Sequence, residues 1–158
     1  MNLKTIIVSV FALCLFAGCA APQAHLIVPD GWQATSIHDL ESGFSQTLAN
    51  EGEQAYIFVK IAPDKTYPRV KEQLDSDLRY IKSVGGKLIE SLVVADQSFA
   101  RLAFTIELAD GTLGIGRIIL RKSTKGKRTV AVRGVWPLDK DAVIRPDFEA
   151  IAASVDYK

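Results

Sequence analysis

Residues 99–136, FARLAFTIELADGTLGIGRIILRKSTKGKRTVAVRGVW, decide the fold class of this chain. Three runs with strand-like composition follow one another here, at 99–108, 113–122 and 128–136. Asp110-Gly111 separates the first two runs, and the polar stretch 124–127 separates the second from the third. Short turns of this kind join antiparallel neighbours. The stretch therefore predicts a three-stranded antiparallel meander.

Upstream of the meander, further strand-like runs surround one segment with a different periodicity. Asn50-Glu51-Gly52-Glu53 is a polar stretch of the type that turns a hairpin, and Pro29-Asp30-Gly31 is a second turn signal. The expected strands are an apolar run at 25–28, a brief strand at 35–37, and longer strands at 44–48, 54–61 and 87–94.

The segment 67–84 has helical periodicity. Apolar residues recur there every three or four positions with charges between them, namely Tyr67, Val70, Leu74, Leu78, Ile81 and Val84. We expect an amphipathic helix of about five turns, with Pro68 in its first turn and Gly85-Gly86 ending it.

A second, shorter helix is expected at the C-terminus. Pro146 suits its first helical position, and Phe148, Ile151, Ala152 and Val155 would share one side. Strands clustered in hairpins, with helices interspersed, predict an α+β domain with a mainly antiparallel sheet. The long central helix and the short C-terminal helix would each cover one face of that sheet.

Two short motifs resemble those of PsbP-like domains. Pro29-Asp30-Gly31-Trp32 resembles the opening P-x-G-W of that family, and residues 148–155 (Phe-Glu-Ala-Ile-Ala-Ala-Ser-Val) resemble its ending F-x-x-I-x-x-S-apolar. The family includes photosystem extrinsic subunits, a nuclear-import Ran-binding protein and DcrB-type bacterial lipoproteins. The resemblance implies an α/β/α sandwich and a non-enzymatic interaction or assembly role. It carries over no functional residue.

The N-terminal 18 residues have the organisation of a secretory signal peptide. Lys4 supplies the positive charge before an apolar run at 5–17, which is short for a membrane span of roughly 20 residues. Leu15-Phe16-Ala17-Gly18-Cys19 then resembles the lipobox of bacterial lipoproteins, although leucine is commonest where Phe16 stands. The sequence predicts cleavage after Gly18 and lipidation, including palmitate, on Cys19.

The N-terminal residues also predict where in the cell the protein is located. Residues 19–24 would form a lipidated tether, and residues 25–158 a single domain. The resemblance to Gram-negative lipoproteins implies the outer membrane, facing the periplasm, because Ala20 rather than aspartate follows Cys19.

Composition excludes several kinds of function. Removing residues 1–18, with Lys4 as their one charged side chain, leaves 18 basic and 18 acidic residues, so the mature domain is neutral. A neutral domain is poorly suited to nucleic acid, which is bound through excess positive charge. Cys14 and Cys19 are the two cysteines, so the mature domain has no disulfide framework or cysteine metal site.

Catalytic and cofactor signatures are weak throughout the chain. His25 and His38 have no spacing that favours a metal site with Asp39 or Glu41, and no G-x-S-x-G elbow is present. The glycines of residues 111–116 lie between two strands, so they suit a turn and close packing rather than phosphate binding. We expect no enzyme activity, no cofactor and no metal, while a hydrolase with residues from distant strands stays open.

The densest basic region lies along the last hairpin. A solvated hairpin tip is the plainer interpretation. The alternative is a patch that meets anionic lipid, lipopolysaccharide or an acidic partner, formed by Arg121, Lys122, Lys125, Lys127 and Arg128. Arg117 and Arg133 extend the same region.

Two functions follow from these observations. The first is an envelope lipoprotein whose non-catalytic domain binds a protein or another envelope component. The alternative is a small-ligand-binding lipoprotein with a pocket between sheet and helix. An apolar cavity lined by aromatics such as Trp32, Phe58 or Phe104 would favour the ligand, and a filled core with an exposed patch would favour the partner.

Overall fold

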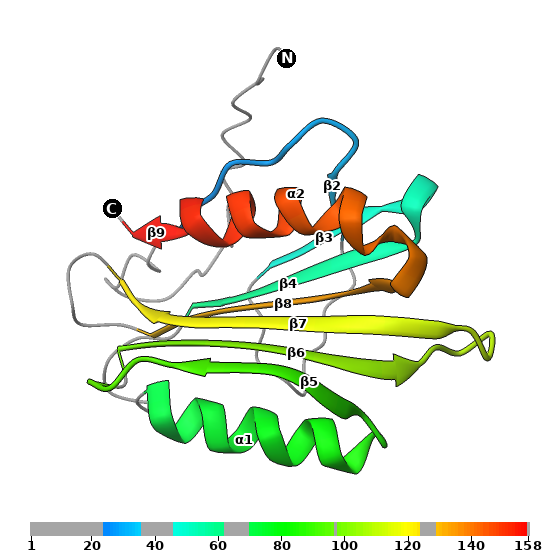
Figure 1. The fold of residues 1–158 in the computed structure, drawn as a ribbon. Helices are drawn as coiled ribbons and strands as arrows, with labels where there is room; N and C mark the ends of the chain where they lie inside the picture. Colours follow the sequence, from blue (N-terminus) through cyan, green and yellow to red (C-terminus); the bar gives the residue numbers. More distant parts are fainter. Residues whose placement is uncertain (1–23, 36–45, 62–69, 97, 124–128, 158) are drawn as a thin grey trace, which may run out of the picture.

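A seven-stranded antiparallel sheet forms the centre of the computed structural model, which describes residues 24–35, 46–61, 70–96, 98–123 and 129–157 (Figure 1). The strand order is β2-β3-β4-β8-β7-β6-β5. The strands are β2 (Gln33–Thr35), β3 (Gln46–Asn50), β4 (Ala55–Ile61), β5 (Lys87–Val93), β6 (Phe99–Glu107), β7 (Leu113–Lys122) and β8 (Thr129–Pro137). The 3-10 turns η1 (Glu51–Glu53) and η2 (Leu138–Lys140) follow β3 and β8.

The predicted meander is confirmed. β6, β7 and β8 are consecutive neighbours, with Phe104 facing Gly116 and Arg117 facing Gly134 in the ladder. Asp110-Gly111 turns the chain between β6 and β7, where Gly111 has a φ of 81° that glycine adopts without strain. The Asn50–Glu53 turn joins β3 to β4 as expected.

One helix packs on each face of the sheet, as Figure 1 shows for α1 (Val70–Ser83) and α2 (Asp141–Ser154). The α+β sandwich is therefore confirmed. Alternate side chains of the strands enter two separate cores. Phe148 and Ile151 of α2 pack with Ile57, Ile115, Val132 and Trp136 in one core. Leu74 and Ile81 of α1 pack with Leu102, Phe104, Ile118 and Leu120 in the other.

One expectation about the helices is wrong. The C-terminal helix begins at Asp141, so Pro146 lies inside it rather than at its first position. It begins earlier because Ile144 joins Phe148 on its buried face, and that burial offsets the one hydrogen bond that Pro146 cannot donate. The described part of α1 has 14 residues, and so has α2. Pro68 lies outside the described residues.

The N-terminal segment runs back along α2. The apolar run 25–28 was expected to be a strand, but only β1 (Ala24–His25) pairs, with β9 (Asp156–Tyr157). Val28 enters the α2-side core instead. The Ile27 N–H donates to Ser154 Oγ at 2.8 Å, and Trp32 Nε1 donates to Asp147 Oδ2 at 2.9 Å.

These contacts explain the two family-like motifs. Trp32 is 4% exposed and closes a turn by donating its N–H to the Pro29 carbonyl at 3.2 Å. Its partner Asp147 immediately precedes Phe148, where the second motif begins. The motifs therefore meet in space and bind the two ends of the chain together.

The sandwich has two distinct ends along its strands. We call the end where β1 pairs with β9 the tether end, because Ala24, the last residue of the predicted tether, lies there. Arg121, near the close of β7, reaches the same end by donating to the carbonyl oxygens of Ala152 and Val155. We call the opposite end, where a surface groove opens, the groove end. It carries η1, η2 and the β6–β7 turn (Figure 1).

Candidate interaction sites

The arginines of the basic region form contacts within the domain. Arg117 is 6% exposed and donates to both carboxylate oxygens of Asp141, at 2.9 and 2.6 Å. Hydrogen bonds from Arg117 hold the pKa of Asp141 below its usual range, and the same pair raises the pKa of Arg117. Trp136 Nε1 also donates to Asp141 at 3.1 Å. Arg117 therefore holds the start of α2 on the sheet.

An ion-pair network extends from that contact to the edge of the sheet. Glu90 of β5 lies 2.8 Å from Arg101 and 3.5 Å from Arg117. Arg101 also lies 3.9 Å from Glu149 on α2, which accepts from Arg145 at 2.9 Å. These charges balance one another, so this face is not a cationic surface.

A second buried pair links α1 to β8. Asp77 is fully buried, accepts from Gln73 at 3.0 Å and pairs with Arg133, whose guanidinium lies 5.6 Å from the centre of the Tyr80 ring. Burial raises the pKa of Asp77 despite the charge of Arg133. Burial, together with Arg133, lowers the pKa of the nearby Lys60.

The five residues predicted as an interaction patch have different environments. Arg121 is half-buried and directs its guanidinium at the carbonyls that end α2, and its burial lowers its pKa. Lys122 is exposed beside it and faces Thr129 across the β7–β8 ladder. Lys125, Lys127 and Arg128 lie outside the described residues. The described part thus places one lysine of the patch in solvent, at the tether end.

Exposed apolar side chains gather on the edge strand β5. The exposed fractions are 45% for Leu88, 58% for Ile89, 46% for Leu92, 42% for Val93 and 42% for the following Val94. Among the described residues, β5 pairs with β6 on one side and with no strand on the other. Contiguous apolar surface beside an open sheet edge is typical of an interaction site.

The main chain of β5 presents hydrogen-bonding groups at this edge. The Val94 N–H donates to the Phe99 carbonyl at 3.0 Å, so these two residues form a bonded pair of the ladder. In an antiparallel ladder, bonded and non-bonded pairs alternate. Val93 faces Ala100 and Ser91 faces Leu102, both at non-bonded positions. The N–H and C=O groups of Ser91 and Val93 therefore point away from β6.

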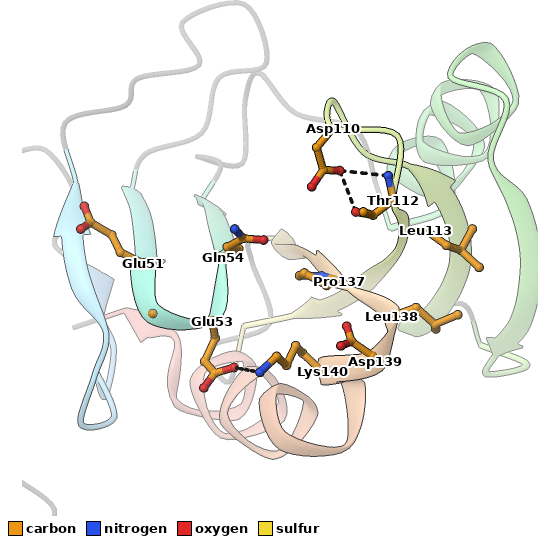
Figure 2. Close-up of a pocket in the computed structure, with 11 residues that line it drawn as sticks. Glu51, Glu53, Gln54, Asp110, Thr112, Leu113, Pro137, Leu138, Asp139 and Lys140 are labelled. Carbon is orange, nitrogen blue, oxygen red and sulfur yellow. Dashed lines mark hydrogen bonds and ion pairs between the residues drawn. The ribbon is translucent and has the colours of Figure 1, made fainter.

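A groove of about 670 Å³ opens at the groove end (Figure 2). Three segments far apart in the sequence line it, namely 51–54, 110–113 and 137–140. Acidic and amide side chains predominate. Glu53 is bridged to Lys140 across it at 3.0 Å, while Asp110 accepts from the Thr112 hydroxyl at 2.7 Å and its N–H at 3.0 Å. Those bonds lower the pKa of Asp110, and the pairing with Glu53 raises that of Lys140.

This groove differs from the predicted ligand pocket. It lies beyond the ends of the strands rather than between sheet and helix, and its lining is mostly polar. Trp32 and Phe104, two of the aromatics expected to line a cavity, are buried in the two cores, and Phe58 is half-buried. Two of the three aromatics named for a ligand cavity are therefore core residues in the described part of the chain.

Other predicted sites have fewer observations. The lipidation residue Cys19 and the histidine His38 lie outside the described residues, and His25 is in β1. In the described ranges, no cluster of three or more histidine, cysteine or acidic side chains is arranged to hold a metal ion. No helix there is long and apolar enough to cross a bilayer.

Sequence reasoning missed both the open edge and the groove. Residues 87–94 were recognised as a strand with many apolar side chains, but an edge strand and a central strand have similar composition. The groove combines three turns. Those at 50–53 and 110–111 are predicted separately by the sequence, without any sign that they meet, and the turn at 137–140 is not predicted.

No protein-family model matches the chain, and no curated protein matches it by sequence. Solved structures do match its fold. A cyanobacterial PsbP (CyanoP) from Synechocystis sp. PCC 6803 is 15% identical, with a TM-score of 0.56, and the match covers 96% of this chain and 99% of that one.

Two further structures share the fold. LpqN, which is involved in cell envelope biogenesis of Mycobacterium tuberculosis, is 12% identical over 87% of this chain and 84% of its own, with a TM-score of 0.57. The Ran-binding protein Mog1p of Saccharomyces cerevisiae is 11% identical over 84% and 88%, with a TM-score of 0.53. At these identities the likeness establishes a PsbP-like and Mog1-like fold and nothing finer.

Proposed function

We propose that this protein is a membrane-anchored lipoprotein of the bacterial cell envelope, whose non-catalytic domain binds another envelope protein. The lipobox ending at Cys19 supports the anchor. Because Ala24 is already paired in β1, four residues at most, 20–23, separate Cys19 from the fold, and the five steps from Cys19 to Ala24 span about 17 Å when extended. Such a tether keeps the domain close to the membrane, which is the outer membrane where the envelope has one.

The observation that carries partner binding is the apolar edge of the sheet. Both cores are built from buried apolar side chains, yet five apolar residues of 88–94 are each at least 42% exposed. Burying apolar surface contributes roughly 25 cal/mol per Å². Leaving these side chains in water therefore forgoes stability that a partner would recover.

The structural neighbours add support at a coarser level. LpqN is involved in cell envelope biogenesis and Mog1p binds Ran, so this fold serves envelope and protein-binding roles in other organisms. Both comparisons concern the fold, and the partner of this chain rests on its own surface.

The anchor is tested by replacing Cys19 with alanine in the full-length chain. We expect palmitate labelling to disappear and the protein to leave the membrane fraction, while Cys14→Ala keeps both. Continued labelling of the Cys19→Ala variant would contradict the assignment.

Partner binding is tested with a photocrosslinking amino acid in the lipidated protein, in its native envelope. Position 92 on β5 is compared with position 143 on α2, where Val143 is 61% exposed but away from the edge. We expect a discrete protein adduct from position 92 and none from position 143. Adducts with lipid alone, or equal protein adducts from both positions, would count against the proposal.

The groove is the observation that favours small-ligand binding as the second candidate. Its 670 Å³ is within the ordinary range for ligand sites, and its lining suits a polar ligand. Native mass spectrometry of the protein released gently from membranes would detect such a ligand. Replacing Thr112 and Gln54 by larger side chains should then abolish the bound mass.

A further inference from the structure

We propose that the N-terminal strap, residues 24–32, makes the lipid tether extensible: residues 24–27 leave the fold under load, while residues 28–32 stay on it. The strap runs along α2 (Figure 1). This inference rests on the proposed function, since the strap is part of a tether only if Cys19 carries lipid. It goes further by giving the anchor two lengths.

The outer part of the strap, residues 24–27, is held by contacts at the surface. β1 pairs with β9 over two residues only, close to the end of the described chain. The Ile27 N–H donates to Ser154 Oγ at 2.8 Å in an exposed hydrogen bond, and Ile27 itself is 37% exposed. Leu26 packs against the α2-side core but is only partly buried.

The inner part of the strap, residues 28–32, is held in the interior. Val28 is 6% exposed and Trp32 is 4% exposed, and both belong to the α2-side core. Trp32 Nε1 also donates to Asp147 Oδ2 at 2.9 Å. Withdrawing these two side chains would return a large apolar surface to water. We therefore expect the strap to open as far as Val28 and no further.

The two parts differ in what offsets the loss of chain entropy. Fixing the backbone costs free energy at each of the residues 24–27, and a few solvent-exposed hydrogen bonds offset that cost only narrowly. Segments with few buried apolar contacts open locally while the rest of a domain stays folded. The outer part of the strap has this character, and the inner part has not.

Opening of the outer part changes the reach of the anchor. With Ala24 paired, the tether spans about 17 Å when extended, and the release of residues 24–27 adds about 13 Å, for a total of about 30 Å. Lipid on Cys19 pulls on the strap through Ala24. A load between the membrane and a bound partner therefore acts first on the β1–β9 ladder, and its release lets the domain move away from the membrane without unfolding.

Hydrogen exchange of the lipidated full-length protein in detergent micelles tests the opening. Relative to their intrinsic rates, we expect the amides of residues 25–27 to exchange at least about 100-fold faster than the Trp32 amide, a difference that corresponds to ~2.8 kcal/mol.

A pair of serine variants provides the matched control. Ser154 and Ser83 lie at the ends of α2 and α1, and each hydroxyl donates to the carbonyl three residues before it. Only Ser154 also accepts from the strap. Ser154→Ala should therefore speed the exchange of the Ile27 amide and leave the Trp32 amide unchanged, whereas Ser83→Ala should affect neither.

Single-molecule pulling measures the change in length. The handles are attached to the Cys19 thiol of unlipidated protein that starts at this residue, and to a cysteine that replaces Asp139 at the groove end. We expect a first increment of about 13 Å in contour length, from residues 24–27, before the domain unfolds. Ser154→Ala should lower the force of this first step, and Ser83→Ala should not.

Three results would overturn the extensible tether. Equal exchange at residues 25–27 and at Trp32 would mean that the strap opens as one unit with the core. A single pulling step, in which the whole domain unfolds, would mean that the outer part has no separate open state. Continued palmitate labelling of the Cys19→Ala variant would refute the anchor of the proposed function, and the tether with it, even where the exchange difference persists.

Discussion

Individual residues decide how closely the layers of this sandwich approach each other. Gly114 and Gly116 belong to a glycine-rich stretch that resembles a phosphate loop only in composition. A Cβ at Gly116 would lie 2.2 Å from Phe104 Cζ, and one at Gly114 would lie 2.6 Å from Leu108 Cδ2. The interpretation of these glycines as turn and packing residues is confirmed.

Gly116→Ala should therefore destabilise the domain. The Phe104 ring lies over this position and is held in the α1-side core, so overpacking should lower the free energy of unfolding by ~2–3 kcal/mol. Urea denaturation measures the loss. Gly52→Ala is the matched control, because its new Cβ would lie 3.7 Å from the nearest side-chain atom and should cost little. Equal losses in both variants would contradict the packing argument.

Asp141 gives a residue-level prediction about pH. Because Arg117 lowers its pKa in the folded state, the ion pair stabilises the domain above the unfolded pKa of aspartate, and this contribution is lost as pH falls through the lower, folded pKa. Asp141→Asn should cost ~1–2 kcal/mol at neutral pH and progressively less in acid. Denaturation series at pH 7, 5 and 3 would show the difference shrinking. A constant difference would exclude linkage through Asp141.

At the scale of elements, α1 and α2 are fixed to the sheet by different kinds of contact. The start of α2 is held by the partly exposed pair Asp141–Arg117, and its end by Arg121. α1 instead buries Asp77 against Arg133. Desolvation is the largest effect on Asp77 and raises its pKa. We therefore expect Asp77 to stabilise the protein more as a hydrogen-bond acceptor than through its negative charge.

That difference predicts unequal losses of stability for two substitutions of Asp77. Asp77→Asn keeps an acceptor for Gln73 and Arg133 without a buried charge, and we expect a cost below ~1 kcal/mol. Asp77→Ala leaves buried donors without their acceptor and should cost ~2–4 kcal/mol. A folded pKa above the unfolded value also means that the parent loses stability as pH rises through it, and Asp77→Asn should remove this loss. Chemical denaturation between pH 4 and 8 tests both statements.

At the scale of the whole molecule, the two ends of the sandwich along its strands differ. The tether end carries β1, β9 and Lys122, and the groove end lies opposite (Figure 1). The proposed tether, about 17 Å when extended, would bring the first end near the membrane and leave the groove facing away from it.

We predict that in this orientation the basic patch binds anionic lipid. Reversing Lys122, Lys125 and Lys127 to glutamate in the Cys19→Ala protein should weaken binding to phosphatidylglycerol vesicles, since each lysine near an anionic surface contributes about 1 kcal/mol. Reversal of Lys71 and Lys82, both exposed on α1, is the control and should change little. Sedimentation with the vesicles at low salt measures both. Binding that survives the first reversal would rule out the patch.

Much of the architecture could be predicted because its signals are local. Hairpin turns, period-two strands and a three-to-four residue helical period are properties of neighbouring residues, and they predicted β6, β7, β8 and α1 within a few residues. The resemblance to a lipobox is local as well, since it depends on a few positions ending at Cys19.

Long-range contacts decided the rest. The sequence suggests a basic surface at Arg117, Arg121 and Arg133, but in the structure these side chains form contacts within the domain. The helix start at Asp141 depends on Trp136 and Arg117, which its own residues do not reveal. Above all, β5 became an edge because the chain crosses through α1 and returns beside β6. The sequence by itself determined which segments pair locally. Only the tertiary structure decided that β5 has a described strand on one side alone, because that depends on where every other strand lies.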